Sequence, residues 1–420
     1  MLIKKDINSI FHFLICSLYI VLLFSMDVGI LIFGLRIYQW ATLALCALLV
    51  LKNIYMKKTL YLPLSIIILF IYMVFITVLG KWDSDSISSF AFFTITMVSI
   101  LWFIQDVNDI NVLYKIFYNV AVFEGVIGII QFVAFVLGYA HLVDFSAQGF
   151  YQQFTIRHGF ITALGLYTEP AHAAPLIIWA VWTFLISKEK KFKFVKKYKT
   201  AIILIFAVLT QSTVVYVSVF LIFCLYVFLY QRVFMKKVQY LVLGVCGIVL
   251  LMLIDSDFVM GALNRFKMFE NVSTTTMNDL SALAIVSNLR IAIEKLKDGY
   301  IFGTGFDSHR IYYDQYIREI YGTIIMAINK NDCATLYTRI FSEFGIVGFV
   351  AFVIASAKRF FTAIKRKNLE AIILLFLFMV VIIRTGSYVN IISITAFMYA
   401  FILPIKENTE KVALISEESE

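Results

Sequence analysis

The chain has 420 residues, of which 61% are hydrophobic and 16% aromatic, and its mean hydropathy is +0.89. This composition excludes a soluble globular domain of ordinary kind and indicates an integral membrane protein. The net charge of +9 comes largely from lysine and arginine clusters beside apolar runs. We therefore interpret the charge as a signal of membrane topology, without a nucleic-acid partner.

Apolar runs long enough to cross a hydrocarbon core of ~30 Å recur along the chain. They lie near residues 10–26, 28–51, 60–80, 87–105, 112–139, 160–187, 238–254, 336–357, 369–383 and 387–405. A further run, 200–230, has basic residues on both sides, which a single crossing would place on opposite faces. We predict two short helices that turn at Gln211-Ser212-Thr213, because these side chains can satisfy the backbone groups that a turn leaves open.

The expected fold class is an all-α polytopic membrane protein with about 12 transmembrane segments, including this short helical hairpin, in one integral domain, 1–420. Alternation of the spans places both termini and the basic clusters on the cytoplasmic side. These clusters are Lys4/Lys5, Lys52/Lys57/Lys58, Lys188–Lys199, Lys236/Lys237 and Lys358–Lys367. The polar stretch 255–334 then forms one large loop on the outer side. The five cysteines suggest neither a disulfide framework nor a metal site.

Ionisable side chains at membrane depth are costly and usually face a cavity or a partner. This chain has several at such depth: Arg36, Glu124, Glu169, His172, Arg339, Glu343 and Arg384. Most of them fall in the outer half of their predicted spans. Arg36 is expected roughly 12 Å inside its span, at 1.5 Å per residue. Because a guanidinium offers a bidentate fork to phosphate, the arginines indicate an outward-facing cavity for a diphosphate. Alternatively, Arg157, Arg339 and Arg384 extend to the interface. Arg339 and Glu343, four residues apart, form a pair on one helix face, or Glu343 has a catalytic role.

The sharpest local pattern is Thr168-Glu169-Pro170-Ala171-His172. Proline suits the first turn of a helix, with Thr168 or Glu169 as its cap. Glu169 and His172 are three residues apart and share a helix face, so that a carboxylate beside an imidazole could take a proton from a sugar hydroxyl. The alternative is a capping glutamate with a structural histidine.

An amphipathic helix is expected at 281–298, and it carries Arg290. The segment Tyr300–Phe306 follows and puts Gly303 and Gly305 into a turn. Since no strand precedes the turn, a dinucleotide site is not expected. Its backbone amides could still meet a phosphate or a sugar. For His309 and Arg310, directly after the turn, the alternative is a solvated loop face.

Four short motifs resemble those of bacterial O-antigen polymerases (Wzy-type), within the O-antigen polymerase/ligase superfamily. Gly165–Ala173 is similar to their Glu-Pro-Ser-His-like signature, and Leu209–Ser212 to their short LTxS turn. Ile301–Phe306 is similar to their hFGxGh turn, where h is apolar, and Arg290 lies upstream as it often does there. Phe341–Gly348 resembles the E-x-G-h-h-G opening of the helix after the large periplasmic loop. The order and placement of the motifs carry the resemblance.

The resemblance implies a metal-independent, cofactor-free glycosyltransferase of GT-C-type architecture in the bacterial inner membrane, with its active face and the loop 255–334 in the periplasm. Such an enzyme moves the growing glycan from undecaprenyl diphosphate to the non-reducing end of a new lipid-linked unit, and it usually works with a chain-length co-polymerase. Glu169 and His172 would act on the acceptor hydroxyl. The diphosphate and glycan would contact Arg157, Arg290, Arg339, Arg384, Gly303, Gly305, His309 and Arg310.

Two other functions compete with polymerisation. O-antigen ligases share the architecture, but their usual histidine lies about 11 residues before the first glycine of GhhG, where this chain has Ala334 between Cys333 and Thr335. A flippase for lipid-linked oligosaccharides would have similar length and a cationic cavity, yet short loops and two related halves. A generic transporter is less favoured, because its polar groups should lie at the midplane in broken helices.

Overall fold

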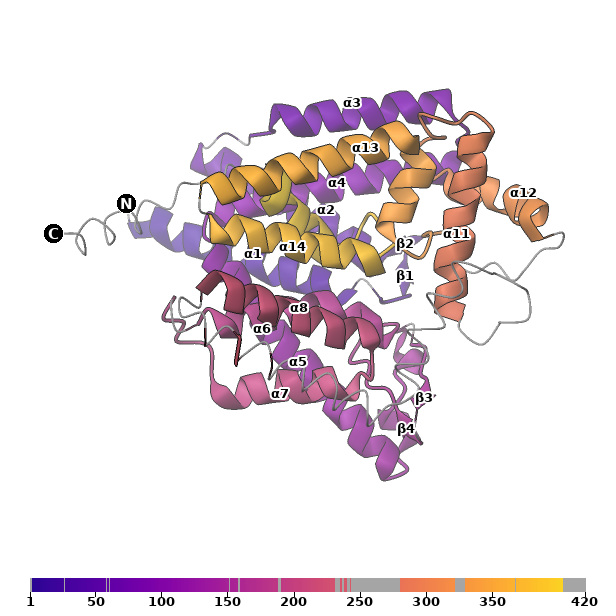
Figure 1. The fold of residues 1–420 in the computed structure, drawn as a ribbon. Coiled ribbons are helices and arrows are strands. Elements are labelled where there is room, and N and C mark those ends of the chain that lie inside the picture. The colour runs from indigo at the N-terminus through magenta and orange to yellow at the C-terminus, as the bar shows by residue number, and fades with distance from the viewer. Residues whose placement is uncertain are drawn as a thin grey trace. The chain divides into compact units, whose positions relative to one another are not determined.

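The computed structural model describes residues 2–25, 27–57, 59, 61–150, 152–157, 159–187, 190–230, 235, 238–239, 242, 280–321, 329–366 and 368–402. These residues are mainly helical (Figure 1). They group into two compact units. Unit 1 comprises Met1–Tyr61, Phe92–Leu263 and Asn390–Ile392, and unit 2 comprises Leu62–Ala91, Asn264–Val389 and Ser393–Glu420. This grouping does not test the prediction of one integral domain, which stays a prediction.

Among the described residues, five helices are long and apolar enough to cross a membrane. They are Ile7–Ser25 within α1 (Leu2–Ser25), α2 (Ile37–Met56), α4 (Ser84–Val107), α5 (Ile110–Val136) and α13 (Leu336–Lys365). Shorter apolar helices are α3 (Leu64–Leu79), η3 with α6 (Pro170–Ala173, Ala174–Leu185), α8 (Thr213–Tyr230), α14 (Leu369–Arg384), and α15 with η4 (Ile391–Phe397, Met398–Ile402). The all-α polytopic membrane class is confirmed; the number of crossings and their orientation stay predictions.

In unit 1, α1 packs on α2, and α5 packs on both α6 and α7 (Lys197–Leu209). Aromatic rings fill this core: Tyr19 stacks on Phe103 with centroids 4.2 Å apart, and Phe117 meets Trp179 at 4.7 Å. Helices α7 and α8 are separated by a turn at 210–212, where Gln211 has φ +47°. The predicted division of the 200–230 run into two short helices is therefore confirmed.

Two helices of unit 1 begin later than expected. Residues 31–36, predicted within a span, form the hairpin β1 (Leu31–Ile32) and β2 (Leu35–Arg36), because Phe33 and Gly34 adopt positive φ. Arg36 lies at the start of α2 with an exposed side chain, and its N–H donates to Gln39 Oε1 at 2.7 Å. The prediction that Arg36 lies deep within a span is thus wrong.

The predicted span 160–187 is helical only from Pro170 to Leu185. Before it, β4 (Phe160–Ile161) pairs with β3 (Ile156–Arg157), and residues 162–169 are irregular. Gly165, within this irregular segment, has φ +65°, a conformation that glycine adopts without strain. The predicted span 238–254 and the loop as far as residue 279 lie almost wholly outside the described residues.

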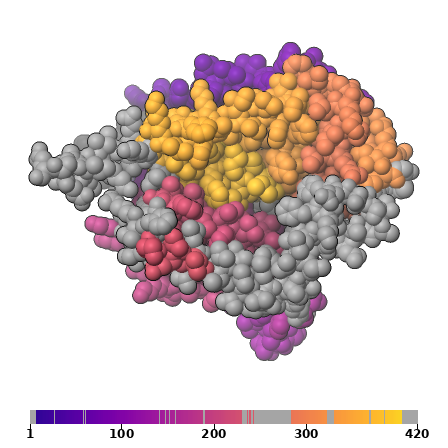
Figure 2. Space-filling view, viewed as in Figure 1, coloured from indigo at the N-terminus to yellow at the C-terminus, as the bar shows by residue number. Residues whose placement is uncertain are grey.

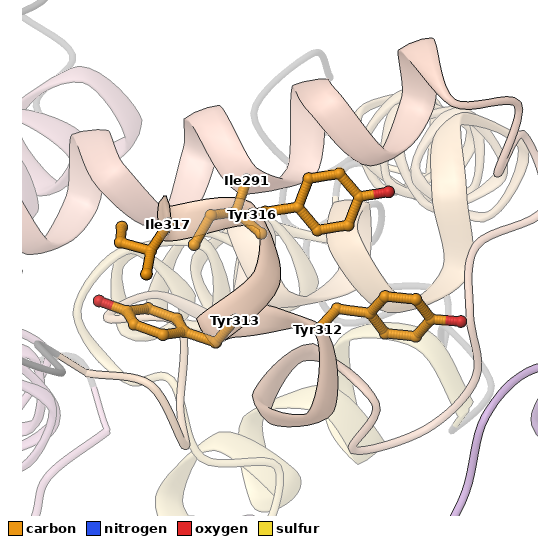
Figure 3. Close-up of a cluster of buried hydrophobic side chains, with 5 residues drawn as sticks. All are labelled: Ile291, Tyr312, Tyr313, Tyr316 and Ile317. Atoms are coloured by element: carbon orange, nitrogen blue, oxygen red, sulfur yellow. The ribbon is translucent and has the colours of Figure 1, made fainter. Parts of the chain in front are cut away.

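In unit 2, α11 (Leu280–Lys297) confirms the predicted amphipathic helix and packs on α12 (His309–Tyr321) and α13. A cluster of Ile291, Tyr312, Tyr313, Tyr316 and Ile317 fills the space between α11 and α12 (Figure 3). Helix α13 bends at Gly345 (φ 64°, ψ −171°), so that its first part runs beside α11 (Figure 1). Helix α14 packs on α13, and their side chains meet along the surface seen in Figure 2.

Candidate functional site

In unit 1, the irregular segment that precedes Glu169 packs on α5 through Gln131. The amide oxygen of Gln131 accepts the N–H of Leu164 at 3.2 Å and of Gly165 at 2.9 Å. Its nitrogen donates to the carbonyl oxygens of Gly165 at 2.9 Å and Val143 at 3.2 Å. Gln131 is fully buried, and its whole amide group is used to hold backbone.

Glu124, about two turns earlier on α5, contacts the next residue of the same segment. Its Oε2 accepts the N–H of Leu166 at 2.7 Å, and the side chain is 2% exposed. A Cβ at position 165 would overlap this carboxylate oxygen, so only glycine allows the approach. The segment and α5 are therefore fitted to each other at Gly165.

Two further residues of unit 1, Asp27 and Gln153, bond the end of this segment. The hydroxyl of Thr168 donates to Asp27 Oδ1 at 2.8 Å, beyond the end of α1. The carbonyl of Thr168 accepts the N–H of Gln153 at 2.8 Å. We call Asp27, Glu124, Gln131 and the segment 164–168 the Gln131 cluster.

Glu169 and His172 follow directly, on one short helical turn. Pro170 opens this turn, as predicted, and the His172 N–H donates to the Glu169 carbonyl at 3.0 Å. Glu169 occupies the N-cap position without a side-chain capping bond, and the Thr168 hydroxyl is directed to Asp27. A side-chain cap from Glu169 or Thr168 is therefore wrong, whereas a structural role for His172, the other part of the alternative to catalysis, is not tested. Both side chains are half-buried; their catalytic role stays a prediction.

In unit 2, buried charges gather around Glu343 of α13. Its Oε1 accepts from Arg339 Nε at 3.0 Å, and its Oε2 accepts from the Asp307 N–H and the Tyr388 hydroxyl, both at 2.9 Å. Glu343 is fully buried. A carboxylate in this position is stable only when cations and N–H donors surround it, as they do here.

Arg339 uses all three sides of its guanidinium within unit 2. Besides Glu343, it donates to Asp307 Oδ1 at 2.5 Å and to the Gly386 carbonyl at 3.1 Å, and it lies 4.4 Å from the centre of the Tyr388 ring. The predicted pair with Glu343 is confirmed, and extension of Arg339 to the interface is wrong, since 6% of the residue is exposed. Contact with a diphosphate stays a prediction.

A directed chain of hydrogen bonds joins Lys295 to His309. The Lys295 ammonium donates to Thr304 Oγ1 at 2.6 Å, to the Ser342 carbonyl at 2.8 Å and to Ser342 Oγ at 3.0 Å. His309 Nδ1 lies 2.8 Å from Ser342 Oγ, and Nε2 lies 2.8 Å from Asn288 Oδ1. Because Oδ1 can only accept, Nε2 carries the proton and Nδ1 accepts from the serine hydroxyl.

His309 is thus held as a neutral imidazole. Burial, followed by the nearby charges of Lys295 and Arg339, lowers its pKa well below 6.5. Burial also lowers the pKa of Lys295, to about 8. A solvated loop face for His309 is wrong, since it is 1% exposed. We call Lys295, Asp307, His309, Arg339 and Glu343 the Glu343 cluster.

The glycine turn after α11 is tied to the same cluster. Gly303 has φ +84°, and a Cβ there would overlap the carbonyl oxygen of Glu343. Every backbone N–H from 303 to 308 donates within unit 2, so these contacts give the turn a structural role. The pairs are Gly303 to Tyr300 O (3.0 Å), Thr304 and Gly305 to Glu343 O (2.9 Å each), Phe306 to Thr77 Oγ1 (2.9 Å), Asp307 to Glu343 Oε2 (2.9 Å) and Ser308 to Gly305 O (3.3 Å).

The remaining predicted arginines differ in their surroundings. Arg310 pairs with Asp307 Oδ2 at 3.0 Å and with Asp83, whose pKa this hydrogen bond lowers to about 2. Arg290 is half-buried on α11 and lies near the Tyr321 hydroxyl. Arg157 belongs to β3 and Arg384 ends α14, but their side chains lie outside the described part. Substrate contact by these residues stays a prediction.

Sequence reasoning missed Lys295, Asp307 and Gln131. A signal for Lys295 exists, because Ala284, Asn288 and Ile291 precede it at helical spacing and all are buried. Lysine on the apolar stripe of a helix requires internal partners. In the described ranges, no group of three or more His, Cys, Asp or Glu side chains is placed to hold a metal ion. Metal independence stays a prediction.

These features define a polytopic helical membrane protein with a polar cluster in each unit. Residues 200–353 match the family model Wzy_C, described as O-antigen ligase. The match supports placement of the chain in the O-antigen polymerase/ligase superfamily and does not separate the two activities. It includes the turn at 210–212, the glycine turn and the kink at Gly345, but not Glu169 or His172. No curated protein matches the chain.

Proposed function

We propose that the protein polymerises undecaprenyl-diphosphate-linked oligosaccharide units in the biosynthesis of O-antigen or another surface polysaccharide. The family match supports a member of the ligase and polymerase superfamily. The observation that carries polymerisation over ligation is Ala334, which occupies the position of the usual ligase histidine. Cys333 and Ala334 are buried with positive φ, and Thr335 accepts the Thr338 N–H to begin α13. This segment starts a helix and offers no imidazole.

In the proposed reaction, an acceptor hydroxyl oxygen attacks the anomeric carbon of the growing glycan. The bond from that carbon to the diphosphate oxygen breaks, and the hydroxyl proton passes to Glu169, with His172 as its partner. The departing diphosphate is stabilised by arginine. Arg339 and Arg310 already pair with carboxylates, so we assign first contact with the diphosphate to Arg290, and Arg157 and Arg384 stay candidates from the sequence alone.

The proposal includes the setting that the resemblance implies. The chain lies in the bacterial inner membrane with both termini cytoplasmic and the loop 255–334 periplasmic. Its architecture is of the GT-C type, it needs neither metal nor cofactor, and a co-polymerase sets chain length. Lipid-linked glycans serve as donor and acceptor.

Purified protein in liposomes, incubated with lipid-linked repeat units, tests the proposal. We expect a ladder of glycans spaced by one repeat unit. Glu169→Gln should remove the ladder, and Glu319→Gln, an exposed glutamate on α12, is the matched control that should retain it. Folded protein without a ladder would contradict the proposal.

Ligation is the second candidate, favoured by the description of the matching family. It predicts transfer of a preformed glycan to lipid A-core without a ladder. The same protein preparation is therefore offered lipid A-core as acceptor. Translocation of the lipid-linked unit without transfer would instead indicate a flippase.

A further inference from the structure

We propose that Glu124 and Gln131 of α5 are positioning residues, which hold the segment 164–168 and thereby set the position of Glu169 and His172. The inference rests on the proposed function for the identity of the reaction. The contacts themselves belong to unit 1 alone.

The first argument is the depth of the segment along a spanning helix. Gln131 and Glu124 lie roughly 8 and 18 Å from the end of α5 at Val136, at 1.5 Å per residue. Hydrocarbon offers no partner to N–H and C=O groups, so irregular backbone at such depth must be satisfied by protein. A straight apolar helix cannot do this with its own backbone, whose groups are already paired. Gln131 and Glu124 supply such partners from α5, and Gln152 adds one more, because its Nε2 donates to the Gly165 carbonyl at 2.8 Å.

The second argument is the match between side chain and backbone. An amide has both a donor and an acceptor, and Gln131 uses both, on the N–H and the carbonyl of Gly165. A carboxyl oxygen accepts, and Oε2 of Glu124 receives the single N–H of Leu166. Gly165, without a Cβ, permits the carboxylate to approach. Each side chain thus has the chemistry that its backbone partner requires.

The third argument is the short distance along the chain to the predicted catalytic pair. The fixed contacts end at Thr168, whose hydroxyl and carbonyl are both bonded. Pro170 restricts the backbone directly after Glu169, and α6 begins at Ala174. Little freedom remains between the two fixed ends. Release of the segment from α5 would displace Glu169 and His172 without changing them.

The test compares the kinetics of four variants in the polymerisation assay. Gln131→Ala and Glu124→Ala should lower kcat roughly 10- to 100-fold with little change in KM, because a small displacement of a reacting group has an effect of this size. Glu124→Gln keeps an oxygen for the Leu166 N–H and should retain at least half of the activity. Gln105→Ala is the matched control, because Gln105 also bonds a backbone carbonyl, that of Tyr61, but outside the Gln131 cluster.

Loss of activity in Glu124→Gln equal to that in Glu124→Ala would overturn the positioning role, since the carboxyl itself would then be needed. Normal kcat in Gln131→Ala would overturn it as well.

Hydrogen exchange of the backbone amides provides a readout that does not depend on activity. In Gln131→Ala, the amides of Leu164 and Gly165 should exchange faster than in the unaltered protein, while those of α6 keep their protection. Faster exchange in a protein that makes no ladder would refute the proposed function and leave the contacts established. Unchanged exchange at both amides would overturn the inference, whatever the activity.

Discussion

The two polar clusters bury similar side chains for different purposes. In the Gln131 cluster of unit 1, side chains of one spanning helix bond the backbone of an irregular segment, and the two ionisable groups that follow are half-buried. In the Glu343 cluster of unit 2, charged side chains bond one another, and each is almost fully buried. The first arrangement leaves its ionisable groups near the surface of the unit. The second joins α11, α12 and α13, because Lys295 and the neutral His309 both bond Ser342 and His309 also bonds Asn288.

The comparison teaches that a buried charge does not by itself mark a site of chemistry. Arg339 looked like a diphosphate ligand, yet every side of its guanidinium is bonded within unit 2. Glu169 makes no capping bond although it stands where a cap would. Alterations in unit 1 should therefore affect turnover, and alterations in the Glu343 cluster should affect stability.

The largest expected effect is on catalysis in unit 1. Glu169→Gln should lower polymerisation by roughly 10²- to 10⁴-fold, the usual contribution of a general base, with normal expression and thermal stability. The measurement is the rate of ladder formation at saturating substrate. Normal long chains from this variant would remove Glu169 from the mechanism.

The second-largest expected effect is a loss of stability in unit 2. Arg339→Met should lower the free energy of unfolding by about 3–5 kcal/mol, because Glu343 and Asp307 would remain buried without their cation. Thermal unfolding in detergent measures this loss, and Arg318→Met, on the exposed face of α12, is the matched control. A stable Arg339→Met variant that no longer binds lipid-linked substrate would reverse our comparison and make Arg339 a ligand.

A smaller effect concerns pH. The folded state holds His309 neutral, with its pKa below 6.5, while the unfolded chain takes up a proton near 6.5. Stability should therefore fall as the pH falls below 6.5, by about 1 kcal/mol between pH 6.5 and 5.5 for one histidine. His309→Gln should show a shallower loss over this range. Identical pH profiles for both proteins would mean that another group controls acid sensitivity.

The smallest expected effect is at Arg290. Arg290→Ala should raise KM for the lipid-linked substrate about threefold, since an ion pair near solvent contributes about 1 kcal/mol or less. The thermal midpoint should not change. Arg318→Ala on the next helix provides the comparison, and equal KM values in both variants would reduce Arg290 to a structural residue of α11.

The local sequence pattern was sufficient to predict an element where the residues of one segment alone determine its structure. The division of the 200–230 run followed from its basic flanks and the polar residues 211–213, and the structure has a turn there. The helix at 281–298 followed from its periodicity. The start of α2 was not predictable in this way, because residues 28–36 are mostly apolar and resemble the start of a membrane-spanning helix. The hairpin that they form depends on positive φ at Phe33 and Gly34.

What the sequence alone determined is the class of protein and the order of its elements, because hydrophobic runs and their basic flanks act locally against the bilayer. It also supplied Pro170 at a helix start and the glycines of the turn near residue 303. Only the tertiary structure decided which polar groups are paired. Arg339 with Asp307, Lys295 with Ser342, and Gln131 with Gly165 are contacts between residues far apart in the chain. Such pairing depends on how helices pack, and no local pattern contains it.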